Sequence, residues 1–265
     1  MKPVHKTKKI DSGVSETVGY IIIFGIMMAG IALVSLYGYP LLVNQQATAN
    51  IQNMERNMIS LQTDINSLTF KNVPYKESTV QVSGGTLSVD KPTASTPSFT
   101  IMDGANTLFS FQPGNIHYRD DSQGAYVELL NGAVVQRFTA QTGSVMISEP
   151  RWYYDPVQQI LVVPMINITA DSTFSSSGIS TVQMAIENEP TTLTFTNPGS
   201  LIFYYGVPVS QVYEDKYNVA WKNYWTGEKL GMPPLVTNEF YTQASFNKPV
   251  KELVVKVYTV KILNL

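Results

Sequence analysis

The sequence contains no cysteine and only two histidines, and charged residues make up 14% of its 265 positions. Without cysteine there is neither a disulfide framework nor thiolate chemistry, so the cysteine-rich secreted scaffolds are excluded. His5 precedes a long apolar run, and His117 lies in an alternating, strand-like segment. A catalytic triad or a zinc site built on histidine is therefore not expected in the body of the chain.

Common catalytic motifs are also missing. There is no phosphate-binding glycine loop, no GxGxxG after a strand and no HExxH. The acidic pairs Asp120–Asp121 and Glu187/Glu189 fall in turn-like settings, where a solvated turn is the simpler interpretation and calcium ligation the alternative. The sequence thus predicts a protein that is not an enzyme and has no cofactor.

Charge is distributed unevenly along the chain. The net charge is −2, but the first thirteen residues carry +3, which leaves −5 for the remainder. An acidic body of this kind has no basic surface for a phosphate backbone, so no nucleic-acid partner is predicted. From Thr17 to Met54 there is no acidic or basic residue at all.

The start of this uncharged run predicts a transmembrane helix. Val18–Leu36 reads VGYIIIFGIMMAGIALVSL, which at about 1.5 Å per residue crosses a hydrocarbon core of roughly 30 Å. Tyr20, Tyr37 and Tyr39 occupy the interfacial ends. Because the lysines precede the run, the N-terminus is predicted to be cytoplasmic and the rest extracellular. A removable signal peptide is the alternative, although its apolar region is typically only ~7–15 residues long.

The residues before the apolar run form a basic, polar leader. Residues 8–19, KKIDSGVSETVG, resemble the class III signal sequences of archaeal type IV pilin-like proteins, with the closest similarity in residues 14–20. The resemblance implies that a prepilin peptidase cuts between Gly13 and Val14 and that the apolar helix stays in the mature protein. Ser12 stands where many archaeal pilins have a basic residue, so cleavage is left open.

Three residues of the anchor are candidates for subunit assembly. By analogy with bacterial pilins, the resemblance implies that Glu16 pairs with the terminal amine of a neighbouring subunit. Alternatively, Glu16 is solvated at the membrane interface, where the helix macrodipole favours an anion and Ser15 is a plausible N-cap. Gly25 and Ala29 form a small-xxx-small pair that lets two helices approach closely.

Residues 41–68 keep a helical pattern after Pro40, which is predicted to kink or interrupt the helix because it lacks a backbone donor. Apolar residues recur there at spacings of three and four. They are Val43, Ala47, Ile51, Met54, Met58, Ile59, Leu61, Ile65 and Leu68. In a pilin this stripe would pack on the globular head of a filament subunit, and in a simple stalk it would fold back onto its own β domain.

From residue 69 onward, period-two alternation broken by turn residues predicts a mainly antiparallel, sandwich-like β domain. Gly84–Gly85 and Asn131–Gly132 are predicted as hairpin turns, the second being the strongest such signal. Residues 210–225 carry aromatics at helical spacing and predict one short amphipathic helix, whose aromatics belong to the core rather than to a sugar-binding platform. The predicted strands are 79–83, 86–89, 98–102, 108–111, 115–119, 125–130, 133–139, 144–147, 160–167, 180–188, 191–196, 201–205 and 250–263.

The predicted fold class is therefore α+β, a long transmembrane and amphipathic helix followed by the β domain. Its segments are a cytoplasmic leader (1–13), the transmembrane helix (14–40), an amphipathic stalk helix (41–68) and the extracellular domain (69–265). Within that domain, Asn167 opens an Asn-Ile-Thr sequon and is a candidate for N-glycosylation.

Together with these features, the resemblance to archaeal pilin-like proteins implies a protein of the cell membrane that is a subunit or minor pilin of a type IV pilus-like filament. Its expected partners are membrane lipid, a prepilin peptidase and other pilin-like subunits. The alternative is an anchored extracellular interaction or adhesion domain that does not polymerise. A membrane-tethered hydrolase is disfavoured because the extracellular part has a single histidine.

Overall fold

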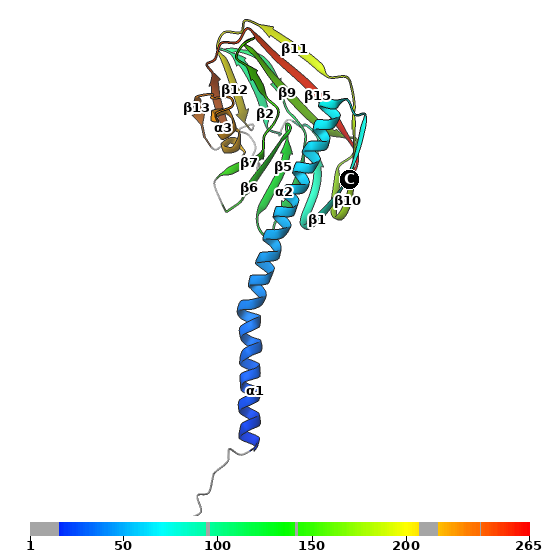
Figure 1. Ribbon diagram of the computed structural model, residues 1–265, viewed down its shortest axis with the longest axis vertical. Coiled ribbons are helices and arrows are strands. Elements are labelled where there is room, and N and C mark those ends of the chain that lie inside the picture. Colours follow the sequence, from blue (N-terminus) through cyan, green and yellow to red (C-terminus); the bar gives the residue numbers. More distant parts are fainter. Residues whose placement is uncertain (1–15, 94–95, 141–142, 207–216, 239) are drawn as a thin grey trace, which may run out of the picture. The chain divides into compact units, whose positions relative to one another are not determined.

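The computed structural model describes residues 16–93, 96–140, 143–206, 217–238 and 240–265 (Figure 1). The chain divides into two compact units. The first, Met1–Thr48, is helical where it is described, and the second, Ala49–Leu265, holds the rest of the long helix and all the strands. This is the α+β class that the sequence predicts.

The helix of the first unit changes its hydrogen bonding just before Pro40. α1 (Glu16–Leu33) leads into a π-helical segment, η1 (Val34–Gly38), in which the Tyr39 N–H bonds the Val34 carbonyl. α2 then runs from Tyr39 to Lys71 without ending at Pro40. An interruption therefore lies where the missing proline donor predicts one, but as a local π-bulge rather than a helix end.

Among the described residues, the strands of the second unit form two sheets. The large sheet has ten strands in the order β7-β6-β5-β4-β1-β10-β15-β9-β8, with β11 also pairing with β15, and the small sheet has the order β13-β14-β12-β2-β3. The strands are β1 (Tyr75–Asp90), β2 (Ser98–Asp103), β3 (Asn106–Phe111), β4 (Asn115–Asp120), β5 (Ala125–Leu130), β6 (Ala133–Phe138), β7 (Ser144–Ser148), β8 (Tyr153–Asp155), β9 (Ile160–Ala170), β10 (Phe174–Ile186), β11 (Thr191–Thr196), β12 (Leu201–Gly206), β13 (Pro234–Thr237), β14 (Tyr241–Phe246) and β15 (Glu252–Asn264).

Strand β15 organises the large sheet. It pairs in parallel with β9 along most of its length, whereas its other edge pairs with β11 in its first half and with β10 in its second half. The other strand pairs are antiparallel, as predicted from the alternating pattern.

The large sheet curls strongly. β4 and β9 stand four places apart in the strand order, yet Gly114, just before β4, donates its N–H to Asn167 Oδ1 on β9 at 3.1 Å. A Cβ added to Gly114 would lie 2.1 Å from the Ile168 carbonyl oxygen, so only glycine permits this close approach.

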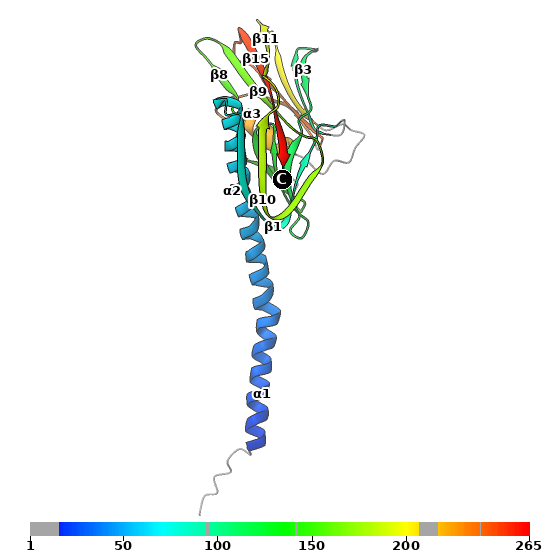
Figure 2. The same cartoon turned by 90° about the vertical axis from the view of Figure 1, so that its right-hand side faces the viewer.

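Two apolar clusters cover the two faces of the large sheet. One cluster joins the apolar stripe of α2 to β1, β4, β5, β6, β9, β10 and β15, and Figures 1 and 2 both show this part of α2 beside β1. The other lies between the large sheet, the small sheet and the short helix α3 (Asn218–Thr226). Because both faces are covered, every residue of β5 is buried.

The stripe of α2 packs on the chain's own sheet. Six of its nine predicted members are buried there, namely Ile51, Met54, Met58, Leu61, Ile65 and Leu68. Full burial of one such side chain contributes about 1.5–3 kcal/mol. This packing is therefore a main source of stability for the second unit, and the buried part of the stripe is occupied within one chain.

The Asn131–Gly132 hairpin is confirmed. Leu130 faces Ala133 in the ladder, and the two turn residues have φ of 49° and 74°, which is the backbone that a two-residue type I′ turn requires.

The predicted hairpin at Gly84–Gly85 is wrong, because β1 passes through both glycines as one strand with a bulge. Gly84 has a φ of 79°, and a Cβ on Gly85 would lie 2.3 Å from the Arg119 carbonyl oxygen and 2.7 Å from the Tyr118 ring. The glycines therefore serve a bulge and a close approach of β4, not a reversal of the chain.

The short helix is confirmed where it is described. α3 begins at Asn218, and residues 210–216 of the predicted helix lie outside the described part of the chain. Its Trp221 and Trp225 are fully buried beside Trp152, with ring centroids 6.0 and 6.2 Å from the Trp152 ring. The helical aromatics therefore belong to the core, as predicted.

Candidate membrane anchor and assembly site

The most unusual surface of the described residues is the apolar surface of α1. No residue from Glu16 to Leu33 is buried, although the sequence after Glu16 is uncharged and rich in isoleucine and methionine. Ile21 is 61% exposed and Ile26 is 67% exposed. Apolar area costs roughly 25 cal/mol per Å² to keep in water, and continuous patches of this kind mark surfaces that another apolar phase covers.

The length of this surface suits a bilayer. In the described part of the chain, one helix, within Glu16–Lys71, is long and apolar enough to cross a membrane. Tyr20 lies near one end of the apolar run, and Tyr37 and Tyr39 lie at the other, all of them exposed. In a bilayer, tyrosines at these positions would place a polar hydroxyl at each lipid–water boundary.

The predicted assembly residues lie open on this helix. Glu16 is the first residue of α1 and is exposed, which puts its carboxylate in the turn where the macrodipole favours an anion. Gly25 and Ala29 are both exposed and lie one turn apart, and a Cβ on Gly25 would meet nothing within 4 Å. Pairing at these three positions stays a prediction. Gly13 and Val14 lie outside the described residues.

Apolar side chains open to another helix are found on α1 and on the start of α2. Val43 is 43% exposed, and Ala47 is half-buried. Ile51 is buried, and from Met54 onward the stripe packs on the chain's own sheet. The division between open and occupied apolar surface therefore falls between Ala47 and Ile51.

Asn167 is half-buried on β9, and its side-chain oxygen accepts the Gly114 N–H that links β9 to β4. The atom that a glycan would modify is the amide nitrogen, not this oxygen. N-glycosylation of Asn167 therefore stays a prediction, although the sequon also has a structural role.

The two residues of the Asp120–Asp121 pair lie in different settings. Asp120 is 1% exposed, and its Oδ1 accepts hydrogen bonds from the Ser122 N–H at 2.9 Å and the Gln123 N–H at 3.3 Å, which caps the β4–β5 turn. Asp121 is exposed and pairs with Arg119. The described residues hold no group of three or more His, Cys, Asp or Glu side chains that could bind a metal ion.

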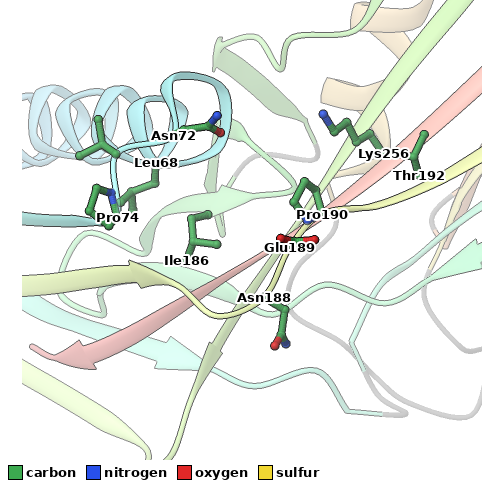
Figure 3. A pocket seen from close by; sticks show the side chains of 10 residues that line it. Leu68, Asn72, Pro74, Ile186, Asn188, Glu189, Pro190, Thr192 and Lys256 are labelled. Carbon is green, nitrogen blue, oxygen red and sulfur yellow. The ribbon is translucent and has the colours of Figure 1, made fainter.

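Sequence reasoning missed a groove of about 650 Å³ in the second unit. Figure 3 shows Leu68, Asn72 and Pro74, at the end of α2 and the start of β1, on one side, and Pro190, Thr192 and Lys256 on the other. It forms where α2 ends and where the chain leaves β10 for β11. The Asn188–Pro190 turn can be recognised in the sequence. The groove itself forms only where this turn and the end of α2 come together.

Comparisons with known proteins give a family and a distant relative. The model of a family of unknown function, DUF7289, matches residues 13–261. An uncharacterized protein of Archaeoglobus fulgidus is 33% identical over 92 residues, which cover 35% of this chain and 29% of the relative. The chain thus spans less than a third of that relative's length. No solved structure matches.

Proposed function

We propose a pilin-like function for this chain, which belongs to DUF7289, a family of unknown function. The chain is an archaeal surface protein, held in the cell membrane by α1, and acts as a subunit or minor pilin of a type IV pilus-like filament. The observation that carries the proposal is the unburied apolar surface of α1, ahead of a β unit with its own core. The archaeal source of the relative supports the assignment.

In this proposal the lysines of residues 1–13 keep the N-terminus in the cytoplasm, and the β unit is displayed outside. A prepilin peptidase removes the leader between Gly13 and Val14. The new terminal amine of one subunit then pairs with Glu16 of a neighbour, because a carboxylate inside an apolar bundle needs a partner.

The packing of α2 limits where subunits can meet. The stripe already packs on its own sheet from Met54 to Leu68, and Ile51 is buried, so helix contacts between subunits are assigned to residues 16–48. Gly25 and Ala29 provide the closest approach, because small side chains let two helix backbones come together in lipid.

The same packing favours one other candidate, an anchored interaction or adhesion domain that does not polymerise. Since the apolar stripe of α2 is buried within one chain, the second unit needs no neighbouring subunit to cover the stripe. The two candidates share the anchor and differ in processing and assembly.

Mass spectrometry and N-terminal sequencing of the protein extracted from archaeal membranes test the proposal. A mature chain that begins at Val14, present in purified surface appendages seen by electron microscopy, supports the pilin-like function. An intact N-terminus and absence from such appendages would leave the anchored domain. Recovery without detergent, with residues 16–43 still attached, would contradict both.

A further inference from the structure

The groove at the end of α2 is lined by polar side chains that have no polar partner within the described part of the chain. Its volume is about 650 Å³, and small-molecule sites occupy roughly 300–1,000 Å³. Its polar side chains are Asn72, Asn188, Glu189, Thr192 and Lys256. Among the described residues, none of these five side chains forms a hydrogen bond or an ion pair. Their full capacity to bind a ligand is therefore open.

Lys256 is the cation among the described residues that line the groove. It lies on β15 and is half-buried, and its Nζ is 5.3 Å from the centroid of the Tyr258 ring. Figure 3 shows its ammonium group directed toward the end of α2, where Asn72 lies. An ammonium in this setting gains a charge-assisted hydrogen bond when a carboxylate reaches it. The first requirement on a ligand is therefore one anionic group.

The remaining lining groups require hydroxyls and an apolar face. The Glu189 carboxylate accepts hydrogen bonds, whereas the amides of Asn72 and Asn188 and the hydroxyl of Thr192 both donate and accept them. Apolar surface lies between these groups and comes from Leu68, Pro74, Ile186 and Pro190. Because Glu189 shares the groove with Lys256, a ligand with a second negative charge would be repelled. One carboxylate, several hydroxyls and an apolar face together describe an acidic sugar.

We propose that this groove binds a hexuronic acid residue of a polysaccharide outside the cell. The carboxylate of the sugar pairs with Lys256, its hydroxyls bond to the other polar side chains, and the apolar face of its ring packs on the prolines and aliphatic side chains. Four of the five polar side chains are exposed, so a sugar within a longer chain can enter. The proposal takes from the proposed function only the display of the second unit outside the cell, and it holds whether or not the chain polymerises.

Saturation-transfer difference NMR tests this site in the full chain, reconstituted in lipid nanodiscs. The acidic probes are trisaccharides of galacturonate, of mannuronate and of a repeat that contains glucuronate, and galactotriose is the neutral probe. Lys256→Met removes the charge and keeps an unbranched side chain. Lys251→Met is the matched control, because Lys251 is an exposed lysine just before β15 and outside the groove. Binding by the isolated protein does not depend on processing or assembly, so its failure is distinguishable from a failure of the proposed function.

At least one acidic trisaccharide is expected to bind the wild type and Lys251→Met about ten times more tightly than galactotriose, because a hydrogen bond to a charged group contributes more than a neutral one. Lys256→Met is expected to lose this preference. Thr192→Val, which removes an exposed hydroxyl and keeps the shape of the side chain, is expected to weaken binding roughly threefold, so the test survives if Lys256→Met folds poorly.

Three results would overturn the proposal. The first is that none of the acidic trisaccharides receives saturation from the wild type. The second is an unchanged affinity in either variant of the groove, provided that its melting temperature shows it to be folded. The third is saturation of an acetylated tri-alanine peptide with a free carboxylate, but of none of the sugars, which would assign the groove to a peptide terminus.

Discussion

At the scale of single residues, buried polar side chains join segments that are far apart in the sequence. Gln62, on the buried face of α2, donates to the carbonyls of Gly132 at 2.7 Å and Glu149 at 3.0 Å. Its side-chain oxygen accepts from the Ser148 hydroxyl at 2.6 Å. Since an unpaired buried polar group costs about 1–3 kcal/mol, this fully paired amide fixes where α2 lies on the sheet.

Asn131 has two roles that substitution separates. Its φ of 49° forms the turn, and its Oδ1 accepts the buried N–H of Ile166 at 2.9 Å. Asn131→Ala is expected to lower the free energy of unfolding by about 2–4 kcal/mol, because it strains the turn and leaves that N–H unpaired. Urea unfolding followed by tryptophan fluorescence measures the change.

Asn197 provides the matched control, because it is exposed and has a φ of 48°. Asn197→Ala loses only the backbone preference, and about 1 kcal/mol is expected. Equal losses in the two variants would show that the bond to Ile166 contributes nothing.

Tyr224 predicts a decline of stability at high pH. Burial and the nearby Glu149 raise the pKa of its phenol well above the ordinary value of 10.0. Below pH 10 the phenol is neutral in both states, so its full contribution is present. Above pH 10 the unfolded chain loses this proton while the folded chain keeps it, and stability falls by up to about 1.4 kcal/mol per pH unit.

Urea unfolding of the full chain between pH 9 and pH 11 measures this decline. Tyr224→Phe is expected to show a shallower decline than the wild type, and Tyr153→Phe, at an exposed position, the same decline as the wild type. A wild-type slope in Tyr224→Phe would rule out this source of the pH dependence.

At the scale of elements, the alternation of apolar and polar residues located most strands. β5 and β11 have the predicted limits, because turn residues flank both. β8, β13 and β14 were missed, since β8 has three residues and β13 begins at a proline. The Gly84–Gly85 pair gave a wrong hairpin prediction, because a bulge and a tight turn both favour glycine. Only the close approach of β4, which is distant in the sequence, shows that a bulge is present.

The features of the candidate site also differ in whether the sequence alone could predict them. The long apolar helix could be predicted, because hydrophobicity and length are local properties of the sequence. The groove could not, because it depends on segments that are far apart in the sequence and meet only in the fold. Strand order rests on long-range pairing such as that of β15 with β9, to which no local pattern points.

The docking of α2 gives a prediction at the scale of one element. Met58 is fully buried at the centre of the stripe, whereas Met27 on α1 is 57% exposed. Met58→Ala is expected to lower the free energy of unfolding of the second unit by about 2–5 kcal/mol through the cavity it leaves. Met27→Ala is expected to change it by less than about 0.5 kcal/mol. Near-UV circular dichroism in urea reports both, and equal effects would contradict the docking.

Assembly through α1 gives the second element-scale prediction. Because the chain has no cysteine, a single introduced cysteine reports contacts between copies without background. Ala29→Cys is expected to form disulfide-linked dimers in oxidised native membranes, since the small-residue face brings helices together. Ile31→Cys, about 200° around the helix, is the control. Equal cross-linking at both positions, or none at Ala29, would favour the anchored domain that does not polymerise.

At the scale of the whole molecule, the two units differ in whether their apolar side chains are exposed or buried. The first exposes apolar side chains along α1, whereas the second buries its apolar residues in two clusters that share the large sheet. This arrangement is compatible with a chain whose first unit meets lipid and whose second unit meets water. The division lies near Thr48, before the first docked residue of α2.

Protease accessibility combined with alkaline extraction tests this account most directly. Intact cells that produce the full chain are treated with protease, and their membranes are then washed with alkaline carbonate. The account predicts that the β unit is cut from outside while a fragment containing residues 16–43 stays in the membrane pellet. A chain that resists protease until the cells are broken, or that leaves the membrane in carbonate with those residues attached, would contradict it.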